Sequence, residues 1–421
     1  MGVKAQPRPV PGHQVSVVEQ RLMEVDGLQP AKIMHPADAE DAARGLRLCD
    51  LAGASVVVWG GGTQMRQGAP PLQYDVAFST ERMTRLLEYE PGDLTCRVEA
   101  GMRIADLQVE LRARGQRLPL DPPHPERATV GGMVAANTNG LGRARHGTVR
   151  DWVIGLAVAY PSGKVARAGG KVVKNVAGYD LMKLHTGGFG TLGVIAEVNF
   201  KVQTMPEAED TMLAHFEDYP AAMEAGFNLA HQYLAPAAMI VLDRVALWKC
   251  GLTADWPWTL ALKVEGYKRA IEPARDVAAK MVRAAGGRVE SSAAPPGFWD
   301  QARDWPCPPD EPEVVLYGIA SLTGLMALMP VAAEAGSSIV QPAAGVFHLR
   351  VPIESAAVAV ERLRHVTGDG AQVVIARAPV ALKQRLDVWG TPPASFSLMR
   401  SIKGALDPNG ILNPGRFVGG I

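Results

Sequence analysis

The hydrophobic and polar positions along this chain repeat with two periods, one typical of helices and the other of strands. Residues 35–54 place acidic side chains ahead of apolar residues at helical spacing, which predicts a helix with an aspartate cap. Residues 55–63, SVVVWGGGT, join a β-branched run to an abrupt glycine stop, which predicts a buried strand and a tight loop. Residues 95–100 and 104–114 continue as a strand and a helix, and Gly115 ends the helix.

Further elements are predicted on either side of these. We expect a short helix between the strand that begins near Tyr74 and the strand at 95–100. Residues 152–169 predict a hairpin, because two β-rich runs flank the turn Pro161-Ser162-Gly163. LGVIAEVNFKVQT, at residues 192–204, predicts one more strand.

The composition changes near residue 206, where amphipathic helices begin to alternate with strands such as WTLALKVEGY and GVFHLRVPI. This alternation favours an α+β second domain. The tail joins a short helix to the turn-rich sequence ALDPNGILNPGRF. We therefore divide the chain into an N-terminal extension (1–29), a first domain (30–205), a second domain (206–395) and a tail (396–421).

Length, charge and cysteine content restrict the class of protein. A chain of 421 residues is too long for one ordinary core. Lys plus Arg and Asp plus Glu each number 43, so bulk charge gives no sign of nucleic-acid binding. The four cysteines have no spacing typical of a disulfide framework, an iron–sulfur cluster or a zinc site, so we expect no metal. No apolar run reaches the roughly 18 residues of a membrane span, and we expect a cytoplasmic protein without a transmembrane segment.

Three glycine clusters are the main candidate binding elements. Gly60-Gly61-Gly62-Thr63 follows a buried strand, Gly131-Gly132 follows a proline-rich strip at 119–125, and a third cluster lies at 187–195. Bare glycines let consecutive N–H groups converge on a phosphate, although each cluster alone is equally consistent with a structural turn. Together they predict a flavin held by main-chain contacts. Residues 145–151, RHGTVRD, add a candidate cofactor contact.

Two strings in this region carry a family resemblance: DPPHPERATVGGMVAANTNGLGRARHGTVRDWV and KVVKNVAGYDLMKLHTGGFGTLGVI. They resemble the FAD-binding domain of the vanillyl-alcohol oxidase superfamily, of the p-cresol methylhydroxylase (PCMH) type. Within it, they resemble the FAD-binding E subunits of glycolate oxidase. ALDPNGILNPGRF is similar to the terminal motif of FAD-linked hydroxy-acid oxidoreductases. The resemblance is dense in residues 56–202 and 397–417, and it implies an α+β fold. In this fold a two-subdomain PCMH-type FAD-binding domain precedes an α+β cap domain, and the tail returns to the FAD domain.

The resemblance also implies a set of FAD-binding residues and a noncovalent cofactor. The implied pyrophosphate loop is Gly60, Gly61, Gly62 and Thr63, with Gln64 beside it. The segment along the pyrophosphate and ribitol is Thr129, Gly131 and Gly132. The turn near the flavin is His146, Gly147 and Thr148, and the adenine contact is Ile195.

The chain departs from the family pattern in its second domain. Relatives that oxidise 2-hydroxy acids carry metal-site motifs of the HxGDGNxH and GEHG kinds, whereas here His215, His231, His348 and His365 are widely separated. Metal-assisted deprotonation of a hydroxy acid is therefore poorly supported, and no catalytic residue is assigned. His348 is interpreted as a strand residue in preference to a base.

The leading hypothesis is the FAD-binding subunit of a multi-subunit glycolate oxidase, or dehydrogenase, acting on a 2-hydroxy acid. The implied partners are a second flavin subunit and an iron–sulfur subunit, through which the complex would also reach the inner face of the cytoplasmic membrane. Two alternatives stay open. One is a self-sufficient, D-lactate-like 2-hydroxy-acid dehydrogenase that uses His124, His146 or His348 as its base. The other is a noncatalytic scaffold with a vestigial flavin fold. Gly61→Val is expected to abolish FAD retention, and Gly132→Leu is expected to lower FAD occupancy and thermal stability together.

Overall fold

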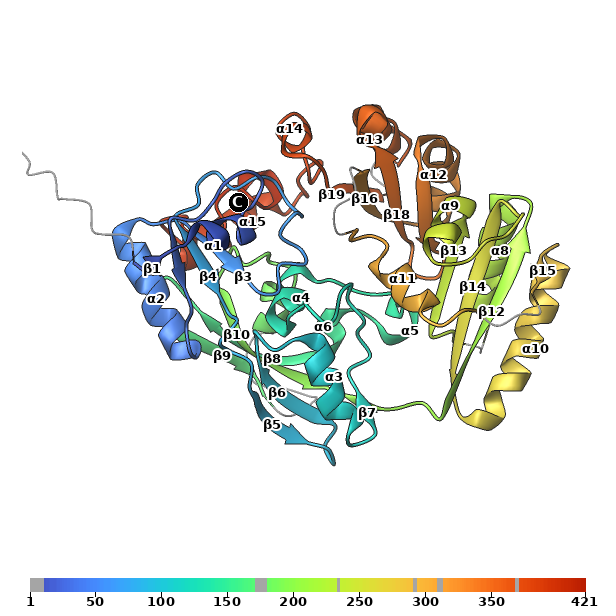
Figure 1. Ribbon diagram of the computed structural model, residues 1–421, viewed down its shortest axis with the longest axis horizontal. Coiled ribbons are helices and arrows are strands. Elements are labelled where there is room, and N and C mark those ends of the chain that lie inside the picture. Colours follow the sequence, from blue (N-terminus) through green and yellow to red (C-terminus); the bar gives the residue numbers. More distant parts are fainter. Residues whose placement is uncertain (1–10, 171–179, 233–234, 291–293, 309–312, 368–370) are drawn as a thin grey trace, which may run out of the picture.

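The computed structural model describes residues 11–170, 180–232, 235–290, 294–308, 313–367 and 371–421. Helices and strands are mixed throughout, and two parts lie side by side (Figure 1). One part holds the first half of the chain together with its C-terminal helix, and the other holds a large sheet with its own helices. Within the described residues the strands form four sheets, of four, five, two and eight strands.

The four-stranded sheet has the order β1-β2-β4-β3. Strands β2 and β3 both run parallel to β4, and helix α2 connects β2 to β3, so this sheet contains a succession of strand, helix and parallel strand. Asp38 caps that helix by accepting a hydrogen bond from the N–H of Asp41, and Gly53 ends it with a φ of 64°. The bounds are β1 (His13–Gln14), α1 (Val17–Leu22), β2 (Lys32–Met34), α2 (Ala39–Ala52), β3 (Val56–Trp59) and β4 (Val76–Ser79).

The five-stranded sheet is antiparallel, with the order β5-β6-β10-β8-β9. It contains the predicted hairpin, β8 and β9, and the predicted strand β10. Its elements and neighbours are β5 (Leu86–Glu90), β6 (Thr95–Glu99), α3 (Ile104–Arg112), β7 (Gln116–Arg117), α4 (Val130–Ala136), α5 (Arg143–His146), α6 (Val149–Trp152), β8 (Val153–Ala159), β9 (Val165–Gly169), α7 (Leu181–His185) and β10 (Val194–Lys201). A two-residue strand, β11 (Gln203–Thr204), pairs with β7.

The prediction of a short helix before residue 95 is wrong, because strand β5 occupies that segment. A turn follows β5, in which the N–H of Asp93 donates to the carbonyl of Glu90 at 3.1 Å. This turn brings residues 86–90 back alongside β6. The backbone ladder between the two strands satisfies donors and acceptors that a helix of five residues would leave partly unpaired.

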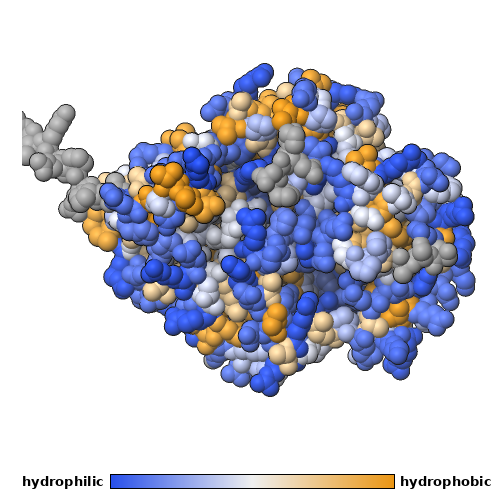
Figure 2. Space-filling view, viewed as in Figure 1, coloured by the Kyte–Doolittle hydropathy of each residue, from blue (hydrophilic) through white to orange (hydrophobic). Residues whose placement is uncertain are grey.

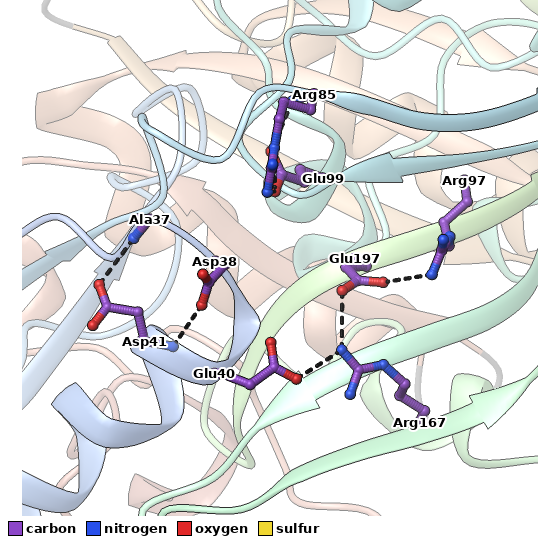
Figure 3. A network of polar contacts seen from close by, with 9 residues as sticks. All are labelled: Ala37, Asp38, Glu40, Asp41, Arg85, Arg97, Glu99, Arg167 and Glu197. Atoms are coloured by element: carbon purple, nitrogen blue, oxygen red, sulfur yellow. Dashed lines mark hydrogen bonds and ion pairs between the residues drawn. The ribbon is translucent and has the colours of Figure 1, made fainter.

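A network of charged side chains joins α2 to the five-stranded sheet (Figure 3). Arg167 donates to Glu40 on α2 at 3.0 Å and to Glu197 on β10 at 3.2 Å. The Nε and Nη2 of Arg85 both donate to the Oε1 of Glu99, whose side chain is 3% exposed. The pairing of a buried carboxylate with a guanidinium offsets the cost of removing it from water.

The eight-stranded sheet has the order β15-β12-β14-β13-β17-β18-β16-β19 and is antiparallel. Helices α8, α10, α12 and α13 bury one face of it in the largest hydrophobic core. Its elements are β12 (Ala208–Phe216), α8 (Tyr219–Ala230), β13 (Ala238–Asp243), α9 (Arg244–Lys249), β14 (Trp258–Gly266), α10 (Lys268–Ala284), β15 (Arg288–Val289), α11 (Phe298–Asp304), β16 (Glu313–Ala320), α12 (Leu322–Ala335), β17 (Ser337–Gln341), β18 (Val346–Pro352), α13 (Ile353–Thr367) and β19 (Ala371–Arg377).

The last residues return to the first part of the chain. After α14 (Val380–Lys383), helix α15 (Phe396–Leu406) lies with the first part of the chain in Figure 1, and a 3₁₀ turn (Val418–Gly420) follows it. Residues 411–413 run along β3: the N–H of Val56 donates to the carbonyl of Ile411 at 2.7 Å, and the N–H of Asn413 to the carbonyl of Val56 at 2.8 Å. The expected α+β fold with a returning tail is confirmed, and the residue bounds of the domains stay a prediction.

The outer surface carries no single hydrophobic band. Figure 2 shows a mainly hydrophilic face on which hydrophobic side chains gather in separate patches. No helix among the described residues combines the length and the apolar character needed to cross a membrane.

Candidate functional site

A narrow cavity of about 80 Å³ lies where the glycine clusters and the tail meet. Segments far apart in the sequence form it: the loop after β3, helix α4, the start of β10 and the residues after α15. It is lined by Val58, Trp59, Gly60, Gly61, Thr63, Gln64, Met65, Thr80, Gly131, Gly132, Ala135, Ala136, Phe189, Gly190, Gly193, Ile195, Asn413 and Arg416. We call it the glycine cavity.

Close packing explains most of the glycines in this cavity. A Cβ atom on Gly61 would lie 1.6 Å from the carbonyl oxygen of Arg127, and one on Gly131 would lie 2.7 Å from the Cβ of Ala100. Gly132 differs, since a Cβ there would meet only the Oγ1 of Thr129, at 3.0 Å. The space beside Gly132 is therefore open, and it is the space of the cavity itself.

A buried cation from the tail reaches the same cavity. Arg416 is 2% exposed, and its Nη2 donates to the carbonyls of Met65 at 2.6 Å and Gln67 at 2.9 Å. Its Nε has no hydrogen-bond partner among the described residues. Burial lowers the pKa of Arg416 to about 10, which still leaves the guanidinium charged at neutral pH. A charged, partly unpartnered guanidinium beside bare glycines matches the requirements of a bound phosphate group.

Asn413 fixes the tail at the cavity wall. Its Nδ2 donates to the carbonyl of Phe189 at 2.8 Å, and its Oδ1 accepts from the N–H of Val58 at 3.3 Å. One amide side chain thus ties together three lining segments.

A second cavity, of about 300 Å³, adjoins the first. The two share Gln64, Ala136 and Phe189 as lining residues. The second cavity lies between the first part of the chain and the eight-stranded sheet, and we call it the sheet cavity. Its wall includes residues 137–141 and Arg143 on one side, and strands β16, β18 and β19 on the other.

Strand alternation decides which residues of the sheet face this cavity. Tyr317 on β16 is paired in register with His348 on β18, and both line the cavity. Their neighbours Leu316 and Phe347 are buried in the core on the opposite face. A single antiparallel sheet thus presents a polar row to the cavity while its other face packs against helices.

Three polar side chains of the sheet cavity lie in a row. The Nη1 of Arg143 is 3.2 Å from the Oη of Tyr317, and the ring centroids of Tyr317 and His348 are 5.2 Å apart. Burial lowers the pKa of His348 to about 4, so its imidazole is neutral at physiological pH. Gln341 adds an Oε1 acceptor that is buried and unpartnered within the described part of the chain.

Asp121 holds the loop that carries Arg143. Its Oδ2 accepts from the N–H of Leu141 at 3.2 Å, and a Cβ on Gly140 would lie 2.0 Å from its Oδ1. Burial raises the pKa of Asp121, against the effect of the backbone donors of Leu141 and Gly142.

The turn at His146 lies outside both cavities. The Nε2 of His146 is 3.1 Å from an oxygen of Glu265, and His146 lines a third cavity of about 520 Å³. Gly147 has a φ of 81°, and Thr148 caps α6 together with Asp151. Burial raises the pKa of Glu265, but hydrogen bonds from His146 and Arg117 outweigh it and lower the pKa to about 2.

The predicted cofactor residues thus fall into three groups. The glycine cavity brings together Gly60, Gly61, Thr63, Gln64, Gly131, Gly132 and Ile195. Gly62 and Thr129 lie behind its wall: Gly62 turns the chain with a φ of 74°, and Thr129 caps α4. His146, Gly147 and Thr148 lie elsewhere.

Sequence reasoning assigned no role to several lining residues, among them Asn413, Arg416, Arg143 and Gln341. The terminal motif was a usable signal for the first two. The last two carry no local signal that separates them from other polar residues. Of the proposed bases, His348 lines the sheet cavity, while the Nε2 of His124 lies 2.7 Å from the carbonyl oxygen of Cys307. No group of three or more His, Cys, Asp or Glu in the described ranges could hold a metal ion.

Comparison with known proteins decides which cofactor fits the glycine cavity. A family model described as "FAD binding domain" matches residues 30–169, and a second, "FAD linked oxidases, C-terminal domain", matches residues 390–417. This chain carries an FAD-binding domain. The two matches contain the lining segments of the glycine cavity up to Ala136 and from Asn413 onward.

Curated relatives have related names. The chain is 32% identical to glycolate oxidase subunit GlcE of Escherichia coli over 227 residues. The aligned region covers 53% of this chain and 57% of the relative. It is 30% identical to glycolate oxidase subunit GlcD of Bacillus subtilis over 249 residues. The aligned region covers 58% of this chain and 53% of the relative. A D-lactate dehydrogenase of Anaerostipes hadrus is 28% identical over 216 residues, 51% of this chain and 45% of the relative. The chain thus spans about half the length of each of these three relatives.

Solved structures extend the likeness to the fold of the whole chain. p-Cresol methylhydroxylase with substrate bound superposes with a TM-score of 0.71 at 16% identity, over 92% of this chain and 88% of that protein. The resemblance to the PCMH-type FAD fold and to glycolate oxidase subunits is confirmed.

FAD is the cofactor of this domain, and the glycine cavity fits it in two respects. Gly60, Gly131 and Gly132 line the cavity without side chains, and the buried Nε of Arg416 has no hydrogen-bond partner in the part of the chain that the structure describes. Both features suit the phosphate groups of the dinucleotide.

Proposed function

We propose that this chain is the FAD-binding subunit of a multi-subunit glycolate oxidase or dehydrogenase. It takes part in the oxidation of a 2-hydroxy acid to the 2-oxo acid, and the electrons pass to an iron–sulfur partner. The observation that carries this proposal is that the two cavities adjoin. Their linings share Gln64, Ala136 and Phe189, so a small acid in the sheet cavity can lie beside a dinucleotide in the glycine cavity. The similarity to two glycolate oxidase subunits supports the subunit role.

Each part of the chain has its own task in this scheme. The backbone donors of Gly60, Gly61, Thr63 and Gln64, together with those of Gly131 and Gly132, hold the cofactor, and Arg416 neutralises its phosphate charge. Bound FAD supplies a two-electron acceptor for the substrate. The sheet cavity excludes bulk water and orients the acid by its polar row. A cytoplasmic location and attachment to a membrane through the complex stay predictions.

A second candidate is a dehydrogenase that acts without partners. One observation favours it: the sheet cavity already contains a cation, Arg143, and a neutral imidazole, His348, which a hydroxy acid requires. The similarity to a D-lactate dehydrogenase agrees with this candidate.

The visible spectrum of the purified chain, recorded before and after anaerobic addition of glycolate, tests both candidates. We expect flavin absorption bands that bleach efficiently only when the partner subunits are present. Bleaching by the chain alone would replace the subunit proposal with the self-sufficient dehydrogenase. A protein that stays colourless after reconstitution with FAD would overturn both and leave the scaffold alternative.

A further inference from the structure

We propose that residues 13–28, which we call the N-terminal strap, form part of the FAD site by positioning the loop after β3, residues 60–68. Residues of the strap line neither the glycine cavity nor the sheet cavity. The strap therefore acts on the cofactor through side chains that contact both the strap and the loop. This inference concerns cofactor binding and holds for any substrate that the bound flavin oxidises.

Residues 25–28 of the strap form a tight turn with Asp26 at its tip. The N–H of Val25 donates to the carbonyl of Leu28 at 2.9 Å, and the N–H of Leu28 donates to the carbonyl of Val25 at 3.0 Å. The two residues between them have positive φ, 49° at Asp26 and 84° at Gly27. Two-residue hairpin turns of type I′ require this combination, and they favour Asp followed by Gly. The local sequence thus fixes the place from which the carboxylate of Asp26 projects.

That carboxylate is paired with one buried cation and lies near a second. The Nζ of Lys383 is 2.8 Å from the Oδ2 of Asp26, and the two side chains are 0% and 5% exposed. The same Nζ donates to the carbonyl of Arg66 in the loop. Burial lowers the pKa of Arg416 to about 10, and the charge of Asp26 acts in the opposite direction. Asp26 thus offsets the burial of both cations that hold the carbonyls of residues 65–67.

A second link between the strap and the loop runs through Tyr74 and carries no charge. The Oη of Tyr74 donates to the carbonyl of Met23 at 3.0 Å and accepts from the Nε1 of Trp59 at 2.6 Å. Trp59 lines the glycine cavity, and a Cβ on Gly62 would lie 3.1 Å from its Cζ3. Tyr74 and Trp59 are 6% and 7% exposed, so both hydrogen bonds are shielded from water. The strap therefore supports the loop near residue 62 as well as at residue 66.

Few other contacts hold the strap in place. Helix α1 has no buried residue, and Val17, Val18 and Leu22 are 65–72% exposed. Strand β1 pairs with β2 over two residues. Val25 is the one fully buried residue of the strap, and it packs in the same small core as Trp59 and Tyr74. Because the contacts that secure the strap are those that reach the loop, order in one stabilises the other.

Thermodynamic linkage gives this arrangement a measurable consequence. If the strap in this position raises the affinity for FAD, bound FAD must stabilise this position of the strap by the same factor. A strap that only stabilised the fold would open locally at the same rate with and without the cofactor.

Hydrogen exchange of the full chain, measured with and without saturating FAD, tests this linkage in the wild-type protein. We expect the amides of residues 17–28 to exchange at least about 5-fold more slowly with FAD. Helix α10 is the internal control, because it packs on β12, β14 and β15 at the opposite end of the molecule (Figure 1), and its exchange should not change. Exchange of the strap that does not respond to FAD would overturn the proposal.

Two variants each remove one link, and both should weaken FAD binding at least about 5-fold in a fluorescence titration. Asp26→Asn keeps a turn-forming residue at the tip but removes the charge, and Tyr74→Phe removes the uncharged link. Titration well below the melting temperature keeps the FAD-free proteins folded. Loss of a negative charge near the cavity would by itself favour the phosphate groups. Weaker binding by Asp26→Asn therefore identifies lost positioning of the loop as the cause.

Glu24→Gln is the matched control, because it makes the same charge change two residues away from Asp26. Its carboxylate is exposed and accepts a hydrogen bond from the Nε2 of Gln29 at 3.0 Å. This variant should bind FAD with wild-type affinity. Wild-type affinity in either Asp26→Asn or Tyr74→Phe would overturn the proposal.

Discussion

Individual glycines of the glycine cavity have different structural roles, although the sequence alone does not distinguish them. The backbone of Arg127 lies against Gly61, so that position is required by the packing of the protein itself. At Gly132 a Cβ would meet one side-chain atom, the Oγ1 of Thr129 at 3.0 Å, and the residue lines the cavity. A substitution at Gly61 therefore tests the fold, and a substitution at Gly132 tests the cofactor.

Gly132→Leu should lower the FAD content of the purified protein at least about 10-fold, because the added side chain projects into the glycine cavity. The melting temperature of the FAD-free protein should change little. Flavin content is measured by absorbance after denaturation, and stability by thermal unfolding.

Gly404→Leu is the matched control, since nothing lies within 4 Å of a Cβ at Gly404, on the surface of α15. It should keep full flavin content. Retention of full FAD by Gly132→Leu would rule out the proposed course of the cofactor past this residue.

Acid should destabilise the protein through buried histidines such as His185. Its side chain is 4% exposed, its Nε2 lies 2.8 Å from the Oη of Tyr160, and burial lowers its pKa from 6.5 to about 4. Between those two values the unfolded chain binds a proton that the folded chain does not, so the free energy of unfolding falls as the pH drops from about 6.5 to about 4.

His185→Gln should flatten this part of the stability profile, which urea unfolding at several pH values measures. The wild-type loss attributable to His185 should be about 1.4 kcal/mol for each pH unit within the window. A variant with the same pH dependence as the wild type would contradict the role assigned to His185.

At the scale of elements, residues of the tail stabilise the loop after β3, which lines the glycine cavity. Residues 411–413 extend the edge of β3, and Arg416 holds the carbonyls of Met65 and Gln67. Lys383 of α14 holds the carbonyl between them, that of Arg66, and pairs with Asp26 at 2.8 Å. Two buried cations from the last 40 residues thus shape a loop that lies more than 300 positions earlier in the chain.

Arg416→Met should therefore lower FAD retention and the free energy of unfolding together. The carbonyls of Met65 and Gln67 would lose a charged donor, at a cost on the order of 2–3 kcal/mol, and the cofactor phosphates would lose their counter-charge. Fluorescence titration with FAD and thermal unfolding measure the two effects. Arg400→Met, on the exposed side of α15, is the control and should affect neither. Normal FAD affinity in Arg416→Met would remove this residue from the proposed site.

At the scale of the whole molecule, an ion pair ties the two parts together beside the third cavity. Arg117 on β7 forms a bidentate pair with Glu265 on β14, and His146 contacts the same carboxylate. The side chain of Glu265 is 4% exposed, so this contact is shielded from water.

Glu265→Gln should lower the free energy of unfolding at neutral pH by on the order of 2–3 kcal/mol, because its pKa is depressed from 4.5 to about 2. The stabilisation is fully present above about pH 4.5 and is lost as the pH falls toward 2. The difference between variant and wild type should therefore shrink in acid. An equal difference at pH 7 and at pH 3, measured by urea unfolding, would show that the ion pair is not its cause.

The sequence alone determined most of the elements and the positions of the glycine-rich loops. Periodicity located α2, β3, α3 and the β8–β9 hairpin, because helix and strand spacing and their end signals are local properties. It failed at β5, where the partner strand outweighed the local preference for a helix. The glycine clusters were recognisable because a bare backbone has few other uses in the middle of regular structure.

Only the tertiary structure decided which of these residues meet. It placed His146 against Glu265 and away from the glycine cavity, although His146 lies within the same dense string of motif residues. It brought Arg416 to the loop after β3, and Arg143 to Tyr317 across the boundary between the two parts. Such encounters depend on sheet register and on the packing of segments hundreds of residues apart, and neither is encoded in local spacing. The sequence therefore specified the glycine-rich loops, and the packing of distant segments specified the glycine cavity and the sheet cavity.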